Sequence, residues 1–558
     1  MTSRINISGL AALALVGVAV VLPPVTLARA LTGGPPTDAV VSGLWLFKGA
    51  LLALALVVWL APGICNRERP ALDPAGPPPG ALGGHRVGTR LMLGGMLLLG
   101  SGLRLHGLGA PLWFDEIQTL VDYVRQPIGH IVTTFDSQNQ HLLYSVLARA
   151  AVVLGGESNA MVRLPAAVFG VLSLWAVYWF GRMITCRREA LLATLLLTVS
   201  YHHVWFSQDA RGYTGLLFWT LLASGLFLRL LRDPGCGWGT VAGYGLALAG
   251  GVYTHSTALF VALAHGLIAL GLWLRQGRSW AALARPLTGL VAGGVFTLVL
   301  YAPVAPQFLR TLVQGDTGTA TTATWQSPLW LARETLAGLA RGLPGGWPAL
   351  GLAILVVAVG VGSYLRRSVT VALLLLLPGV LTGGAVLALH HNLWPRFFFF
   401  AAGFAVLVAL RGGFAIADRL LAGRWSALPV GAVLLVATAS LWTVPRAWGP
   451  KQDYRAARDW VRARADSGDA VVTVDLTRYP CERFYACSFT GVDTVEQLEA
   501  VEGQHRATWV LYTFPIRLAA AKPAVWRRLQ ADYGEAAVFP GTVGGGAIVV
   551  VRRPPPAS

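Results

Sequence analysis

Long apolar runs separated by short polar stretches fill most of the first 450 residues. Thirteen of these runs approach the roughly 20 mostly apolar residues that a transmembrane helix needs. They lie at about 8–29, 41–62, 88–105, 161–181, 189–206, 213–231, 240–256, 257–274, 286–304, 347–365, 369–389, 395–411 and 426–444. The pattern predicts a polytopic α-helical membrane protein with about 13 transmembrane helices, of which the two short spans sharing 240–274 are the least distinct.

From about residue 450 the pattern changes to that of a soluble domain. Helical periodicity covers 452–466 and 523–533. Strand-like runs cover 470–475, 507–514, 538–542 and 547–552. Alternation of this kind predicts that residues 450–558 form a small α/β domain.

Composition and charge sharpen this prediction. The 558 residues are 55% hydrophobic and 13% charged, against about 25% charged in soluble domains, which excludes a soluble enzyme and a disordered chain. The net charge of +18 is compatible with a nucleic-acid binder. However, the segment from Lys451 onward is nearly balanced, so the excess lies in the loops between apolar runs.

The arginines in those loops indicate the orientation. With the N-terminus in the cytoplasm, 18 arginines fall in short cytoplasmic loops and 11 in the longer loops on the other side, as the positive-inside rule requires. The 13 spans then put the C-terminal domain outside. The first run also resembles a signal peptide, with Ala28-Arg29-Ala30 as its cleavage site, and cleavage leaves the later orientation unchanged.

Two outer loops are too long to be simple turns. Loop 106–160 contains an apolar stretch, His141 to Leu154, which we interpret as a helix at the membrane interface, with a full span as the alternative. Loop 305–346 is rich in Thr, Gly and Pro and is predicted to be mobile or to order on substrate binding.

The five cysteines fit this topology. Three of them lie in predicted cytoplasmic loops, whereas Cys481 and Cys487 lie close together outside. A disulfide between them suits an oxidising compartment, and two unpaired thiols are the alternative. No Cys/His spacing resembles a zinc site.

The strongest local signal is Trp113-Phe114-Asp115-Glu116 in the first outer loop. Adjacent helical positions do not face the same way, so the two acids do not match the opposed carboxylates of a glycoside hydrolase. One acid acting as a base, and the other binding a metal or holding the loop, fits better. The alternative is a plain helix start, in which Asp115 caps and Glu116 complements the dipole.

Several further motifs follow in order along 88–411. They are Gln140-His141-Leu142-Leu143-Tyr144, Arg163-Leu164-Pro165, Ser207-Gln208-Asp209-Ala210-Arg211-Gly212-Tyr213, Tyr253-Thr254-His255 and Trp394-Pro395-Arg396-Phe397. Together with Asp115-Glu116, they resemble the GT-C glycosyltransferases that use polyprenyl-phosphate sugars. The resemblance is closest to protein O-mannosyltransferases, aminoarabinose lipid A transferases and rhizobial lipopolysaccharide sugar transferases.

The chain also departs from that family. It has His141-Leu142-Leu143 where the family often has His-Pro-Pro, and the C-terminal domain carries no motif of the family. The resemblance implies a GT-C catalytic module at 88–449, preceded by two additional transmembrane helices at 1–87 and followed by the α/β domain at 450–558.

The resemblance implies an inverting transfer of a sugar from a polyprenyl-phosphate donor to an acceptor hydroxyl or a similar nucleophile. The acceptor is a cell-envelope glycolipid, a polysaccharide or a protein at the outer face of a bacterial cytoplasmic membrane. Asp115 matches the family's catalytic acid and is the predicted base, with Glu116 beside it. A phosphate leaving group needs cations more than it needs an acid, and guanidinium matches phosphate geometry. Arg211 and Arg396 are therefore the predicted phosphate ligands.

The remaining candidates have less defined roles. Asp209, Tyr213, His141 and His255 are predicted to contact the substrate or an unidentified divalent metal ion, although Asp209 has the alternative of pairing with Arg211. A structural role is favoured for Arg163. The alternative function is a lipid or sugar transporter or flippase, but transporters place ionisable groups near the membrane midplane rather than at one face.

Overall fold

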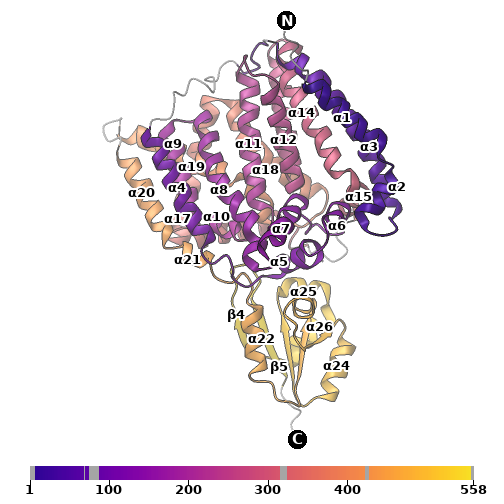
Figure 1. Ribbon diagram of the computed structural model, residues 1–558. Helices are drawn as coiled ribbons and strands as arrows, with labels where there is room; N and C mark the ends of the chain where they lie inside the picture. Colours follow the sequence, from indigo (N-terminus) through magenta and orange to yellow (C-terminus); the bar gives the residue numbers. More distant parts are fainter. Residues whose placement is uncertain (1–6, 68, 74–86, 315–322, 422–426, 554–558) are drawn as a thin grey trace.

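The computed structural model describes residues 7–67, 69–73, 87–314, 323–421 and 427–553, and shows a large helical bundle with a small sheet domain at one end (Figure 1). Residues 315–322 of the predicted loop 305–346 lie outside the described residues, as do Arg4, Glu68, Arg86 and Arg424. The helices before the sheet domain are α1 (Ile7–Val21), α2 (Pro24–Thr32), α3 (Asp38–Cys65), α4 (Val87–Leu105), α5 (Phe114–Gln118), η1 (Thr119–Val124), α6 (Ile128–Thr133), α7 (Leu142–Gly155), α8 (Asn159–Ile184), α9 (Arg187–Thr198), α10 (Tyr201–Ser207), α11 (Tyr213–Arg232), α12 (Trp238–Thr254), α13 (Ala258–Arg275), α14 (Trp280–Tyr301), η2 (Ala302–Val304), α15 (Ala305–Gln314), α16 (Pro328–Gly342), α17 (Gly346–Arg367), α18 (Val369–Ala388), η3 (Pro395–Ala401), α19 (Ala402–Leu421), α20 (Leu428–Leu441) and α21 (Val444–Ala447).

A polytopic membrane protein is confirmed, whereas the predicted count of 13 spans is not. Among the described residues, eight helical segments are long and apolar enough to cross a membrane, and two bent helix pairs raise the number to ten. The other three predicted spans correspond to α4, α12 and α20. Of these, α12 has 17 residues and α20 has 14, and α4 carries two arginines.

Both bent pairs have a local cause. The predicted span 8–29 breaks between α1 and α2 with a bend of 86° at Pro23 and Pro24, because proline cannot donate a helical hydrogen bond. The predicted span 189–206 bends by 62° between α9 and α10. There the Ser200 side chain accepts a hydrogen bond from the His203 backbone N–H and so starts a new helix.

The N-terminal helices pack on one side of the bundle. α3 lies along α14 and η2, and it approaches η2 so closely that a Cβ at Gly43 would lie 2.4 Å from the Ala302 carbonyl oxygen. α2 meets α6 in the same way at Gly129. At the centre, α11 packs against α8 and α12, and this buries most of its side chains.

The C-terminal segment forms the predicted small α/β domain. Its elements are α22 (Tyr454–Arg462), β1 (Ala470–Val474), η4 (Asp475–Thr477), α23 (Arg478–Arg483), β2 (Thr490–Val492), α24 (Val495–Gln504), β3 (Thr508–Tyr512), α25 (Pro515–Ala521), α26 (Pro523–Asp532), β4 (Gly534–Phe539) and β5 (Ile548–Arg553). The five strands are ordered β2-β1-β3-β5-β4, with β2, β1 and β3 parallel and β5 and β4 antiparallel. β4 begins four residues before the predicted strand 538–542. The prediction missed this start because the edge strand is largely exposed and has no apolar run there.

Of the two alternatives for Cys481 and Cys487, a disulfide or two unpaired thiols, the structure has the second. Cys481 and Cys487 are free cysteines, and their sulfur atoms lie 2.7 Å apart. They flank the end of α23, the helix of the sheet domain that packs against α5.

Candidate active site

The first predicted outer loop folds at the end of the bundle that faces the sheet domain (Figure 1). The acids begin the short helix α5, and the chain continues as the π-helix η1. The apolar stretch predicted to lie at the membrane interface forms α7, a 14-residue helix shorter than the spanning helices.

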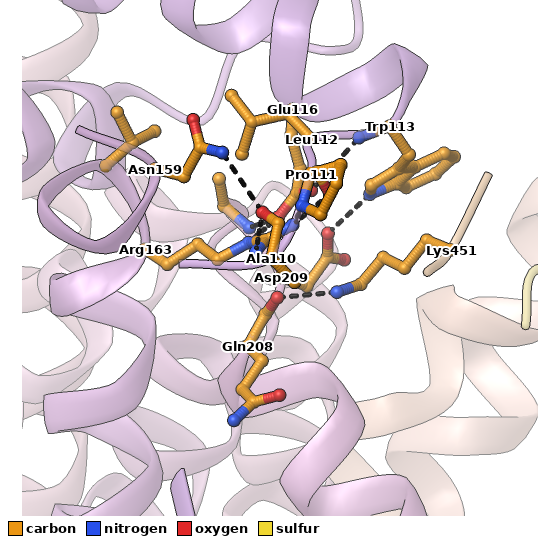
Figure 2. Close-up of polar contacts among 12 residues, drawn as sticks. Ala110, Pro111, Leu112, Trp113, Glu116, Asn159, Arg163, Gln208, Asp209 and Lys451 are labelled. Atoms are coloured by element: carbon orange, nitrogen blue, oxygen red, sulfur yellow. Dashed lines mark hydrogen bonds and ion pairs between the residues drawn. The ribbon is translucent and has the colours of Figure 1, made fainter. Parts of the chain in front are cut away.

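Glu116 is fully buried and paired with Arg163 of α8 (Figure 2). The guanidinium donates to both carboxylate oxygens, at 2.6 and 2.5 Å, and also to the carbonyls of Leu108, Ala110 and Pro111. Glu116 also accepts from the backbone N–H groups of Trp113 and Ala210. Burial raises the pKa of Glu116, but Arg163 and the hydrogen bonds outweigh it and hold that pKa below its ordinary value. The pair ties together the loop before α5, helix α8 and the segment before α11.

Asp115 faces the other way, toward two arginines from distant parts of the chain. Its Oδ2 lies 2.9 Å from the Arg396 guanidinium and 3.5 Å from that of Arg211. The Asp115 side chain is 14% exposed and that of Arg396 is 30% exposed, whereas Arg211 is almost completely buried. The three predicted residues therefore meet in a partly open site.

The two arginines retain hydrogen-bonding capacity. The Nε and one terminal nitrogen of Arg211, and the Nε of Arg396, are buried and have no hydrogen-bond partner among the described residues. The other terminal nitrogen of Arg211 lies 3.1 Å from His141 Nε2. An anion entering beside Asp115 would satisfy these donors, because guanidinium groups bind phosphate and carboxylate oxygens with paired N–H groups.

His141 and His255 lie behind the arginines, together with Tyr213. The two histidine rings are 4.7 Å apart between centroids, and Tyr213 lies within 5.6 Å of both. Burial and the nearby arginines lower the pKa of His255 to about 3 and that of His141 well below its ordinary value. Both imidazoles are therefore neutral at physiological pH. The Nδ1 of His141 accepts from the Gly212 N–H at 2.8 Å, which fixes the loop that carries Arg211.

Asp209 belongs to the same loop but points toward Trp113. Its Oδ1 accepts from Trp113 Nε1 at 2.9 Å, while its Oδ2 is buried and has no hydrogen-bond partner among the described residues. Burial raises the pKa of Asp209 to about 6. The alternative pairing with Arg211 is not what the structure shows, because Arg211 is directed toward Asp115.

Lys451 and Gln452, to which no sequence motif points, also contact the loops of the candidate site. Lys451, just before the sheet domain, is buried and donates to the Gln208 carbonyl at 2.5 Å (Figure 2). Gln452 accepts from the Phe114 N–H at 3.1 Å. Burial lowers the pKa of Lys451 to about 8, against the opposing effect of Glu116. Lys451 is one of three lysines in the chain, and that rarity was the available signal.

The described residues do not fit a metal ion. Nowhere in the described part of the chain do three or more His, Cys, Asp or Glu side chains gather as ligands. Asp115 is engaged by arginines, and a divalent cation beside Arg211 and Arg396 would be repelled by them. The expected divalent ion therefore has no ligand set here, and no chemical step is assigned to one.

Comparison with known proteins bears on the same region. Residues 140–305 match the family model of dolichyl-phosphate-mannose-protein mannosyltransferases. No curated protein sequence matches the chain.

Three solved structures illustrate the similarity. ArnT from Cupriavidus metallidurans bound to undecaprenyl phosphate has 12% identity and a TM-score of 0.49, with 83% of this chain and 97% of that chain covered. The Archaeoglobus fulgidus oligosaccharyltransferase tethered with an acceptor peptide has 12% identity and a TM-score of 0.46, with 83% and 74% covered. The S. cerevisiae protein O-mannosyltransferase Pmt1-Pmt2 complex bound to the sugar donor has 18% identity and a TM-score of 0.34, with 47% and 38% covered.

The family match spans His141, Asp209, Arg211, Tyr213 and His255. It confirms, over residues 140–305, the resemblance to GT-C glycosyltransferases that the sequence motifs predict.

Proposed function

We propose that the protein is an integral membrane inverting glycosyltransferase that moves a sugar from a polyprenyl-phosphate donor to an acceptor hydroxyl. The acceptor is a cell-envelope glycolipid, a polysaccharide or a protein, and the reaction takes place at the outer face of a bacterial cytoplasmic membrane. The family match over residues 140–305 supports the reaction class and the type of donor.

One observation carries this proposal: a carboxylate and two arginines with unsatisfied donors share a partly open site. Asp115 contacts Arg396 and lies beside Arg211, and three guanidinium nitrogens there have no hydrogen-bond partner among the described residues. Such an arrangement suits a reaction in which a base and a leaving phosphate lie next to each other.

The chemistry follows from these positions. The donor phosphate binds Arg211 and Arg396. As the two arginines turn toward the phosphate, their interaction with Asp115 weakens. Asp115 accepts the proton of the acceptor hydroxyl while the hydroxyl oxygen attacks the anomeric carbon from the side opposite the phosphate. The bond between that carbon and the phosphate oxygen breaks, the configuration inverts, and the arginines stabilise the charge left on the phosphate.

The other residues act mainly by holding this geometry. Glu116 has both carboxylate oxygens occupied by Arg163 and backbone N–H groups, so we assign it a positioning role rather than a part in proton transfer. His141 and Gly212 fix the approach of Arg211. Tyr213 and His255 are buried behind the arginines, and we propose that they contact the substrate once the arginines have turned to the phosphate.

The transporter alternative is weaker on the same geometry. The ionisable residues of this site come from α5, the segment before α11 and the start of η3. They meet at Asp115 of α5, which lies at the end of the bundle next to the sheet domain (Figure 1). A transport pathway would require such groups near the membrane midplane.

The decisive experiment is transfer from a radiolabelled polyprenyl-phosphate sugar by purified Asp115→Asn protein. We expect the rate to fall by about a thousandfold, because the amide cannot accept the proton, while the thermal unfolding temperature stays near that of the wild type. Glu157→Gln is the matched control, since Glu157 lies in the same loop in an exposed ion pair with Arg125. Wild-type transfer by Asp115→Asn would refute the assignment of the base.

A further inference from the structure

A cavity lies between the helical bundle and the sheet domain, lined by none of the residues of the candidate active site. It has a volume of about 470 Å³, within the range of ligand sites. One wall comes from α10, α16 and α21 of the bundle, and the other from residues 540–549 and Pro515 of the sheet domain.

Two arginines from different helices line this cavity. Arg341 ends α16 and Arg446 belongs to α21. Both guanidinium groups are within electrostatic range of Tyr201 on α10. Both side chains are exposed and have no hydrogen-bond or ion-pair partner among the described residues. The Glu334 carboxylate lies near Arg341, but neither arginine has an ion-pair partner among the described residues, so the site offers two unpaired guanidinium groups and a phenol to one ligand.

The opposite wall is apolar and held in place. Thr542 and Val543 donate backbone hydrogen bonds to the carbonyls of Pro450 and Lys451. The Thr542 hydroxyl accepts from Trp205 Nε1 at 2.8 Å. A Cβ at Gly541 would lie 2.1 Å from the Lys451 carbonyl oxygen, so glycine is required for this close approach. The cavity is therefore built by specific contacts between the two parts of the chain.

The surroundings indicate where the ligand comes from. Trp442, just before α21, is 82% exposed, and Trp347, at the start of α17, is 58% exposed. Exposed tryptophans at helix ends are typical of the membrane interface, where lipid headgroups lie. Arg341 and Arg446, a few residues from these tryptophans, are thus at the depth of a lipid headgroup.

One short helix, α10, reaches from the cavity to the candidate active site. Helix α10 runs from Tyr201 at the cavity to Ser207, directly before the loop that carries Arg211. Seven helical residues span roughly 10 Å. Lys451 lies 4.9 Å from the ring of Trp205 on the same helix. A bound amphiphile would therefore lie about one short helix away from the donor phosphate site.

We propose that this cavity binds the phosphate group of an anionic amphiphile, and that this amphiphile is the acceptor of the sugar. The two arginines bind the phosphate, and the Pro and Val side chains of the sheet domain contact the apolar part. Binding by the cavity stands on its own geometry, whereas the identification of the ligand as the acceptor rests on the proposed glycosyltransferase function.

The test is photo-crosslinking of the full-length protein with a long-chain alkyl phosphate that carries a diazirine, mapped by mass spectrometry. We expect the wild type to be labelled within 540–549, and Arg341→Ala/Arg446→Ala to reduce that labelling about tenfold. Arg527→Ala is the matched control, because Arg527 is an exposed arginine of α26 outside the cavity. Glu334→Gln should increase labelling, since this carboxylate lies near Gly544 and Arg341.

Each alternative gives a distinct result. Equal labelling by the alkyl phosphocholine with the same diazirine, or labelling that survives the double variant, would overturn the proposal. Displacement by millimolar inorganic phosphate alone would show a free-phosphate site and would overturn the amphiphile assignment, and its absence supports that assignment.

The acceptor role has its own readout. The double variant should lose transfer to membrane lipids, whereas Arg527→Ala should retain it, and unchanged transfer by the double variant would refute the role. Asp115→Asn should be labelled like the wild type, so failure of the glycosyltransferase proposal is distinguishable from failure of the cavity proposal.

Discussion

At the scale of single residues, the adjacent acids Asp115 and Glu116 differ in burial and in their arginine partners. Glu116 is buried against Arg163, while Asp115 is partly exposed between Arg396 and Arg211. The difference arises because neighbouring positions of a helix point in different directions. One acid can therefore brace the loop while the other faces the space that a substrate would enter.

The Glu116–Arg163 pair yields a prediction about stability. Glu116→Gln leaves the Arg163 charge buried without its partner, so the free energy of unfolding should fall by about 3 kcal/mol. The double variant Glu116→Gln/Arg163→Gln should recover part of the loss, because neither charge then remains buried alone. Denaturant titration of the purified proteins measures both values. A single variant as stable as the wild type would show that the pair does not brace the loop.

Lys451 yields a prediction about pH. Its pKa is lowered from 10.5 to about 8 by burial, so the folded protein loses this proton before the unfolded chain does. Between pH 8 and 10.5 the unfolded state binds more protons, and stability should therefore rise with pH. The transfer rate should fall over the same range, because the ammonium that offsets Glu116 and Asp209 disappears.

Pairing the two readouts separates this effect from general alkaline inactivation, in which rate and stability fall together. Lys451→Met should show a low rate without the alkaline step near pH 8. A wild-type alkaline step retained in Lys451→Met would exclude Lys451 as its origin.

At the scale of elements, each of the 13 predicted spans corresponds to a helix or to a pair of helices. The apolar pattern did not show where the two bent pairs are interrupted. Pro23 and Pro24 account for the break in the helix, but the apolar pattern does not show that α2 then packs against α3 and α6 at an angle of 86° to α1. The predicted strand 538–542 missed the start of edge strand β4, because the exposed residues there show no alternation of apolar and polar side chains.

In the candidate site, too, the sequence predicted some of the residues and missed others. The motifs identified Asp115, Arg211, Arg396 and His141, and these side chains do meet in space. Lys451 lies 243 positions from the Gln208 carbonyl that it contacts. No local pattern predicts a contact of that separation, because it depends on how the sheet domain packs on the bundle.

The loop before α11 can be tested as an element. A Cβ at Gly212 would lie 2.8 Å from Thr254 Cγ2, 2.9 Å from His141 Nδ1 and 3.0 Å from the Thr254 carbonyl oxygen. Gly212→Ala should therefore displace the loop that carries Arg211, and raise the KM for the polyprenyl-phosphate donor by about tenfold. Gly294→Ala is the control, because nothing lies within 4 Å of a Cβ there. An unchanged donor KM in Gly212→Ala would show that the position of this loop does not set donor binding.

At the scale of the whole molecule, the sheet domain is fastened to the candidate site by side chains from several of its elements. Tyr479 donates to Asp122 of η1, and Tyr485 donates to the Leu112 carbonyl just before α5. Gln452 and Lys451 add the contacts to Phe114 and Gln208. The sheet domain and the site must therefore lie on the same side of the membrane, so one measurement of orientation places both.

Labelling with a membrane-impermeant maleimide tests that orientation. The native Cys186 is exposed and lies in a predicted cytoplasmic loop, whereas Arg527 is exposed on the sheet domain. With Cys481 and Cys487 replaced by serine, Arg527→Cys should react in intact spheroplasts, and Cys186 should react only after permeabilisation. The physical reason is the arginine excess in the loops on the Cys186 side, which favours retention in the cytoplasm. Reaction of both thiols from the same side would contradict the predicted topology, and reaction of Cys186 alone in intact spheroplasts would place the Asp115 site in the cytoplasm.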